Sequence, residues 1–148
     1  MKRILLVTAF IISSWMSKGQ ELGIRFGEVV GGNVAVDGVF SLGEFSRVHA
    51  DVSFGDGLGI EGLWDFFYKP IPGASGLNWY IGAGPSMFIH DDLFLLGAAG
   101  EIGLEYRFAE VPIALGLDWR PVFWIVEDTD FSARGFGFNI RYVFGGTK

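Results

Sequence analysis

The stretch GFGFNIRYVF, residues 135–144, carries a large apolar side chain at every second position near the end of the chain. The apolar positions are Phe136, Phe138, Ile140, Tyr142 and Phe144. This period-two alternation is typical of a β-strand whose two faces meet different surroundings. In a soluble barrel the aromatic face would be the interior, whereas in a membrane barrel it would face lipid. The orientation of this strand therefore decides the class of protein.

Length and composition restrict the alternatives. The chain has 148 residues, which favours one domain; half of them are hydrophobic, 16% are aromatic and 23 are glycine. Cysteine is absent, which excludes disulfides and thiolate metal sites. The formal net charge of −6 argues against a nucleic-acid partner, which would require a basic surface. We expect no cofactor.

The first nineteen residues differ from the rest. Lys2 and Arg3 precede an apolar run from Ile4 to Trp15, and Ser17 and Gly19 place small residues before Gln20. This order predicts a secretory signal peptide over residues 1–19 and an exported domain over 20–148. The alternative is an N-terminal membrane anchor, but the apolar run is shorter than the roughly 20 residues that a spanning helix needs.

Eight alternating segments follow, separated by turn signals such as Gly31-Gly32-Asn33 and Gly55-Asp56-Gly57. They cover residues 21–30, 33–41, 46–54, 57–69, 77–90, 93–108, 111–126 and 131–144. Short connections predict an antiparallel meander, and closure into an all-β, eight-stranded, up-and-down barrel would remove its edges. A two-sheet sandwich is the alternative architecture.

The two faces of these segments differ in chemistry. One face carries no charge across the middle of the strands. The other alternates glycine with charged residues, among them Arg47, His49 and Lys69. We predict a network of ion pairs on this polar face, formed by Arg25, Asp37, Asp51, Glu61, Asp65, Glu101, Glu105, Arg107, Asp118, Arg120 and Arg141.

The residue types on the polar face indicate which way it points. Its bases are nearly all arginine, which suits fixed ion pairs in confined space, and strand glycines make room for close approach. The apolar face continues to one strand end with aromatic residues, as in a membrane-interface girdle. These are Tyr68, Trp79, Tyr106, Phe108, Tyr142 and Phe144. We therefore predict a transmembrane barrel with a polar, side-chain-filled lumen; the alternative is a soluble periplasmic lipid-binding barrel.

The chain resembles the small eight-stranded outer-membrane barrels of Gram-negative bacteria, the OmpA/OmpX/OmpW-like class. The supporting features are the predicted signal peptide, the eight alternating segments and the last strand, where Ile140, Tyr142 and Phe144 match the insertion signature of that class. Residues 145–148 extend past the final Phe, which departs from the pattern. The resemblance implies location in the cell outer membrane, contact with lipid and lipopolysaccharide, and insertion by the barrel-assembly machinery.

An eight-stranded barrel has an interior just wide enough for side chains. We therefore expect a plugged, ion-paired lumen and a structural, monomeric protein, with an ion or proton path as the alternative reading of the lumen charges. A second possible function uses an apolar outer mouth formed by Phe88, Leu95, Val122 and Trp124. The resemblance to OmpW-like barrels implies binding or transport of small hydrophobic molecules there.

Metal binding and catalysis receive less support from the sequence. The outer turns are acidic, at His90-Asp91-Asp92 and Glu127-Asp128-Thr129-Asp130, but their spacing matches no calcium-loop motif, and we predict no metal site. The two histidines are His49 and His90. Ser86 lies four residues from His90 along one strand, too far for a nucleophile–base hydrogen bond. We predict no enzymatic activity.

Overall fold

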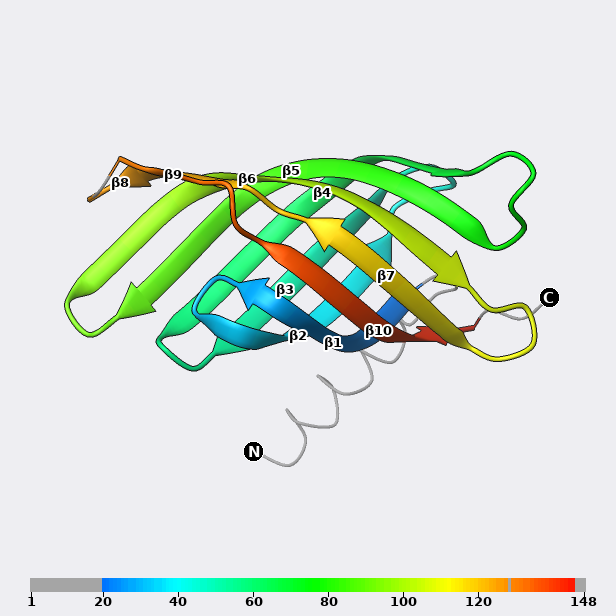
Figure 1. Ribbon diagram of the computed structural model, residues 1–148, viewed down its shortest axis with the longest axis horizontal. Coiled ribbons are helices and arrows are strands. Elements are labelled where there is room, and N and C mark those ends of the chain that lie inside the picture. The colour runs from blue at the N-terminus through cyan, green and yellow to red at the C-terminus, as the bar shows by residue number, and fades with distance from the viewer. Residues whose placement is uncertain (1–19, 128, 146–148) are drawn as a thin grey trace, which may run out of the picture.

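The computed structural model describes residues 20–127 and 129–145, so the predicted signal peptide at 1–19 lies outside the described residues. The described chain is almost entirely β-structure (Figure 1). Its strands are β1 Gln20–Val29, β2 Gly32–Ser41, β3 Arg47–Phe54, β4 Leu58–Pro70, β5 Leu77–His90, β6 Leu93–Arg107, β7 Ile113–Trp119, β8 Val122–Val126, β9 Phe131–Ser132 and β10 Phe136–Phe144. No helix long and apolar enough to cross a membrane occurs in these two ranges.

The strands close into one antiparallel barrel. Their order is β5-β4-β3-β2-β1-β10-β7-β6, and pairing of β5 with β6 joins the two ends. β7 and β8 both pair with β6, so β8 continues the position of β7 in the wall. β9 pairs with β8 and leads into β10, so it continues the position of β10. The ten strands therefore occupy eight positions around the barrel, which we call staves. The predicted closed, eight-stranded, all-β architecture is confirmed, and the two-sheet sandwich is wrong.

Two of the predicted segments are interrupted. Arg120 and Pro121 divide the predicted strand 111–126 into β7 and β8, both of which pair with β6. The predicted strand 131–144 divides into β9 and β10 at Gly135, which has φ +117°. A Cβ at position 135 would lie 2.2 Å from the carbonyl oxygen of Arg120, so glycine permits the close approach of the two segments just before β10 begins.

A β-bulge in β4 changes the orientation of the residues that follow it. Trp64 pairs with Ala83 and Phe67 pairs with Ile81, so one extra residue lies between them on β4. As a result Tyr68 turns inward and donates a hydrogen bond to Glu105, while Lys69 is exposed. The predictions that Tyr68 belongs to the outer aromatic girdle and Lys69 to the polar face are therefore wrong.

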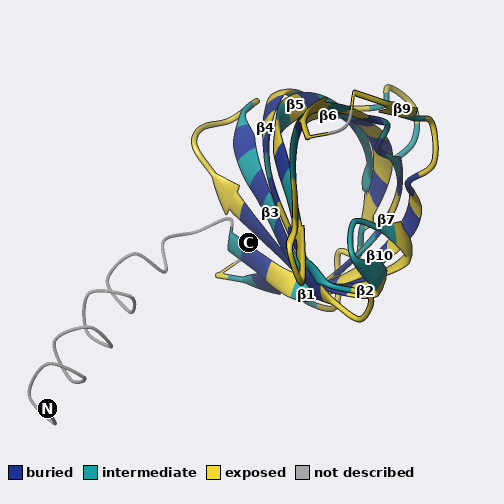
Figure 2. Ribbon diagram, turned by 90° about the vertical axis from the view of Figure 1, so that its left-hand side faces the viewer, coloured by how far each residue is buried: buried dark blue, intermediate teal, exposed yellow. Residues whose placement is uncertain are grey.

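The remaining strands keep the predicted division into two faces. Exposed and buried residues alternate along them, and Figure 2 shows this alternation on the strands that face the viewer. Leu22, Trp64, Leu117 and Phe136 are 51%, 55%, 59% and 64% exposed on the outside, whereas Arg25 and Arg141 are 1% exposed inside. The outside of the barrel is thus apolar and its core is charged.

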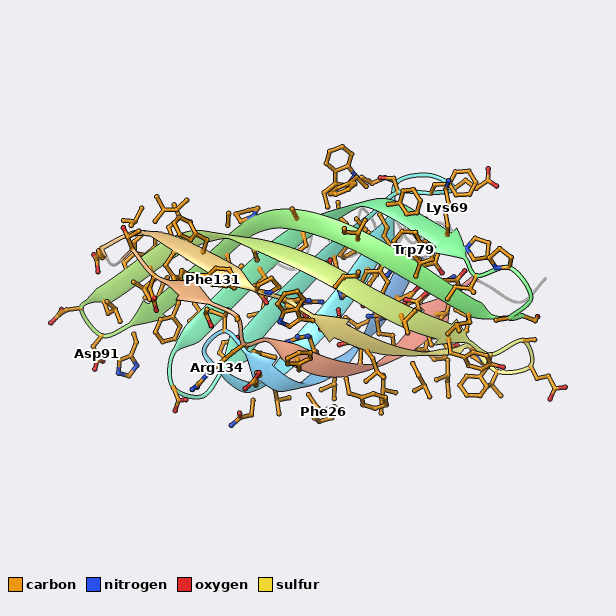
Figure 3. The ribbon with its side chains drawn as sticks, turned by 45° about the horizontal axis from the view of Figure 1, so that its top comes forward. Phe26, Lys69, Trp79, Asp91, Phe131 and Arg134 are labelled. Carbon is orange, nitrogen blue, oxygen red and sulfur yellow. The ribbon has the colours of Figure 1, made fainter. Side chains whose placement is uncertain are left out.

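The wall is uneven in height. β5 and β6 have 14 and 15 residues, whereas β1 and β3 have 10 and 8. We call the end that holds Gln20 and Phe144 the terminal rim, and the end that holds the β5–β6 turn at Asp91 the far rim. β5, β6, β8 and β9 extend beyond the β1–β2 turn at the far rim (Figures 1 and 3).

Candidate functional site

Near the terminal rim, the guanidinium of Arg141 joins three carboxylates from three other strands. It donates to Glu21 (2.7 Å, Nε to Oε2), to Asp37 (2.9 Å, Nη1 to Oδ2) and to Glu105. Glu105 also accepts from Arg107, at 2.8 Å between Nε and Oε1. Because every partner lies on a different strand, this group ties β1, β2, β6 and β10 together across the lumen.

Arg47 of β3 lies between two aromatic rings inside the barrel. Its guanidinium carbon is 4.2 Å from the ring centroid of Tyr68 and 4.5 Å from that of Tyr80. It donates to Asp65 at 2.7 Å and to Glu105 at 2.8 Å. Cation–π contacts and charge-assisted hydrogen bonds together fix this side chain, which fills the lumen at that level.

Arg120 is the centre of the second half of the network. It donates to Glu101 (3.0 Å, Nε to Oε2) and to Asp51, and it lies 3.6 Å from Glu61 and 3.4 Å from Asp118. Its side chain is 1% exposed. One arginine therefore offsets the charge of carboxylates from β3, β4, β6 and β7, which suits the five-donor guanidinium.

Arg25 closes the network toward the far rim. Its Nη2 lies 2.6 Å from Asp118 Oδ1 and 2.8 Å from the carbonyl oxygen of Gly135. Asn139 donates to the other carboxylate oxygen of Asp118 at 2.7 Å. A Cβ at Gly137 would lie 2.5 Å from the guanidinium of Arg25, so the missing side chain gives this arginine its space.

Above this network a cavity of about 370 Å³ opens at the far rim. Its wall includes Val30, Phe88, Val122 and Trp124, and the buried core residues Leu63, Ala99 and Val122 pack beside it. Its other lining residues include the charged Arg25, Glu28, Glu61, Arg120 and Arg134. The cavity thus combines an apolar wall with a charged floor, a combination that can hold a small amphipathic molecule.

The structure brings all eleven predicted network residues into the barrel interior or its terminal rim. Of the four predicted mouth residues, Phe88, Val122 and Trp124 line the cavity. Leu95 does not line it; this residue pairs with Phe88 on the neighbouring strand and is half-buried. The insertion signature Ile140, Tyr142 and Phe144 lies on the outer face of β10. The functional roles of these residues remain predictions.

Sequence reasoning omitted several members of the network. Glu21 is 2% exposed and accepts from Arg107 and Arg141, although its place at the start of β1 resembled a strand end. His49, Arg47 and Asn139 lie on the predicted polar face, and that alternation was the signal available for including them. Tyr68 was hidden by the bulge, which no residue pattern indicated.

His49 occupies the middle of the lumen and is fully buried. It belongs to two groups of possible metal ligands, one with Asp37 and Asp51 and the other with Asp65 and Glu101. Within each group, one ring nitrogen and one oxygen of each acid lie within 4.8 Å of one another. These are the described residues whose chemistry suits a metal ion. His90, by contrast, is exposed at the far rim and stacks on Phe88. Ser86, the serine on the same strand, donates its hydrogen bond to Glu61 at 3.3 Å.

Fold and interior together define a class: a closed eight-stranded antiparallel barrel with an ion-paired polar core and an apolar exterior. No protein-family model, no curated protein and no solved structure matches the chain. Functional conclusions therefore rest on the geometry of this molecule.

Proposed function

We propose that this protein is an integral outer-membrane barrel, exported by its N-terminal segment, whose plugged lumen serves a structural role. The observation that carries the proposal is the inverted distribution of polarity. Large apolar side chains cover the outside of every stave, and eight carboxylates are buried inside. Soluble monomers rarely expose contiguous apolar patches above a few hundred Å². Lipid around the barrel would remove this apolar surface from water.

The alternative of a soluble periplasmic lipid-binding barrel has less support. Such a barrel needs an apolar interior to hold an acyl chain, as in lipocalin-type barrels. Here the interior at mid-height is filled by Arg47, Arg120 and Arg141 with their carboxylate partners. No enzymatic activity forms part of the proposal.

Fractionation and gel mobility test the membrane assignment. We expect the expressed protein in the outer-membrane fraction, and we expect its unheated form to migrate differently from its boiled form, because a closed barrel resists unfolding by detergent. A known periplasmic protein provides the control for leakage. Recovery in the soluble periplasmic fraction with no effect of heating would contradict the proposal.

The far-rim cavity favours a second function, the binding or passage of small hydrophobic molecules. Its apolar wall at Val30, Phe88, Val122 and Trp124 stands above the charged floor. The continuous ion-pair network below this floor favours binding at the mouth over passage along the barrel axis.

Trp124→Arg tests this second function, because it places a charge in the apolar wall. We expect it to reduce binding of a fluorescent hydrophobic probe such as 1-N-phenylnaphthylamine to the purified barrel. Ile125→Arg is the matched control, since Ile125 is the next residue of β8 and is 58% exposed on the outside. Equal probe binding by wild type and Trp124→Arg would sink the binding function.

A further inference from the structure

Three side chains inside the barrel have the composition of a metal site: His49 of β3, Asp65 of β4 and Glu101 of β6. A ring nitrogen of His49 and one carboxylate oxygen of each acid lie within 4.8 Å of one another. Imidazole and carboxylate ligands together suit Zn²⁺ and similar divalent transition metals. Ligand atoms around a tetrahedral Zn²⁺ ion lie about 3.4 Å apart. His49 Nδ1 and Glu101 Oε2 already lie 3.3 Å apart.

Two oxygens of this cluster lack a hydrogen-bond donor among the described residues. They are Asp65 Oδ1 and Glu101 Oε1, on residues that are 0% and 3% exposed. A buried acceptor without a partner loses its hydration and gains nothing in exchange. A cation held between the two carboxylates would supply the missing interaction to both.

Gly82 of β5 leaves room for an ion between the two acids. It pairs with Glu101 across β5 and β6, and the bulge in β4 places Asp65 beside it on the other side. A Cβ at position 82 would lie 2.4 Å from Asp65 Oδ1. Bulges occur frequently next to functional sites, where they redirect a side chain. Here the bulge and the glycine together form a niche lined by carboxylates.

His49 is oriented as a metal ligand would be. Its Nε2 lies 2.5 Å from Asp37 Oδ1 and its Nδ1 lies 3.3 Å from Glu101 Oε2. With a metal ion bound to Nδ1, the ring proton would be on Nε2 and would be donated to Asp37. Arg120 Nη2 lies 3.1 Å from Nδ1 and 3.0 Å from Nε2, so it is not aligned with the lone pair of either nitrogen. Histidines that bind metals usually donate their other N–H to a carboxylate in this way.

The buried groups of the lumen carry an excess of negative charge, which a bound cation would reduce. Eight carboxylates are buried in the described part of the chain: Glu21, Asp37, Asp51, Glu61, Asp65, Glu101, Glu105 and Asp118. The bases that face them there are four buried arginines and the partly exposed Arg107. With His49 neutral the acids exceed these bases by three, and a divalent cation would offset two of the three.

We propose that His49, Asp65 and Glu101 bind one divalent transition-metal ion inside the barrel, with Asp37 orienting His49 and Gly82 providing the space. The neighbouring group of Asp37, His49 and Asp51 is less suited, because Asp37 already accepts from both His49 and Arg141. Arg120 contacts His49 and Glu101 and also lines the far-rim cavity. The cavity therefore leads to within one side chain of the site.

Metal content of the purified, folded full-length protein in detergent tests the proposal. After treatment with a chelator and dialysis against Zn²⁺, elemental analysis should give one tightly held equivalent in wild type. Co²⁺ should replace it and give the visible absorption of a site with nitrogen and oxygen ligands. Asp65→Asn and Glu101→Gln should lose this ion. Glu61→Gln, a buried carboxylate outside the cluster, should retain it.

Gly82→Ala keeps all three ligands and fills the niche, so weaker Zn²⁺ binding by this variant is the most specific expected result. The gel shift on heating verifies that each variant is folded. A folded wild type without a bound equivalent would overturn the proposal, as would equal metal loss from Glu61→Gln and Asp65→Asn. The readout does not depend on membrane location.

Discussion

At the scale of single residues, arginine is the side chain that makes this interior possible. Arg120, Arg141 and Arg47 each contact at least two carboxylates from different strands. Lysine has three donors on one compact ammonium at the end of a flexible stem, so it could not reach separated acceptors as the planar, five-donor guanidinium does. The lumen is therefore a set of arginine-centred groups, and each arginine substitutes for the water that its carboxylate partners have lost.

Arg120→Ala should destabilise the barrel by about 3–5 kcal/mol, because removing one member of a buried ionic group leaves its partners uncompensated. Urea unfolding in detergent, followed by tryptophan fluorescence, measures this free energy. Arg107→Ala is the matched control. Its side chain is 32% exposed at the terminal rim, and its partners Glu21 and Glu105 also accept from Arg141, so the loss should be smaller. Similar stability of wild type and Arg120→Ala would contradict the importance of this group.

A second substitution shows whether the loss comes from unpaired charge. Glu101→Gln removes a carboxylate that Arg120 neutralises. Adding it to Arg120→Ala should therefore recover part of the stability that the single change removes. Additive destabilisation by the two changes would indicate a packing effect instead.

At the scale of strands, period-two alternation predicted eight staves and the content of both faces. It was sufficient because each stave separates two unlike environments along most of its length. It failed where the backbone departs from regular pleating: at the bulge that turns Tyr68 inward, and at Arg120-Pro121 and Gly135, where the predicted strands divide. Such departures depend on pairing with a neighbouring strand, which one segment does not encode.

The candidate site, too, could be predicted from the sequence only in part. Alternation placed the charged residues on one face, but it gave no information about which strands face each other across the lumen. The convergence of His49, Asp65 and Glu101 needs the closed barrel, which brings β3, β4 and β6 together around the lumen. Leu95 shows a smaller discrepancy: it pairs with the cavity residue Phe88 and is half-buried, but it does not line the cavity.

β10 also offers a prediction about assembly. If Tyr142 and Phe144 act as the insertion signature, Phe144→Ser should reduce the amount of folded protein in the outer membrane several-fold. Phe40→Ser is the matched control, because Phe40 is an outward aromatic residue that is paired with Gln20 at the same rim. Immunoblots of membrane fractions measure both variants. An equal reduction of folded protein by Phe144→Ser and Phe40→Ser would show that insertion depends on apolar surface at this rim and not on the last strand in particular.

At the scale of the whole molecule, the two faces exchange the roles they have in a soluble protein. The polar face is buried and bonded to itself, and the apolar face has no protein partner in the described barrel. A surface of this kind loses contact with water only in an apolar solvent, and this supports the proposal that lipid surrounds the barrel. The far-rim cavity and the proposed metal site are features of this polar interior.

The central claim is that lipid contacts the outer face, and a spin label at Leu117→Cys tests it most directly. The chain has no cysteine, so each single-cysteine variant carries one label. Leu117 is 59% exposed on β7, and Asp91, whose side chain is 88% exposed at the far rim, provides the aqueous reference.

In reconstituted vesicles, the label at 117 should be relaxed strongly by oxygen, which concentrates in lipid, and weakly by a water-soluble nickel chelate. The label at Asp91→Cys should show the reverse. Strong relaxation by the nickel chelate at both positions would place the apolar face in water and contradict the account.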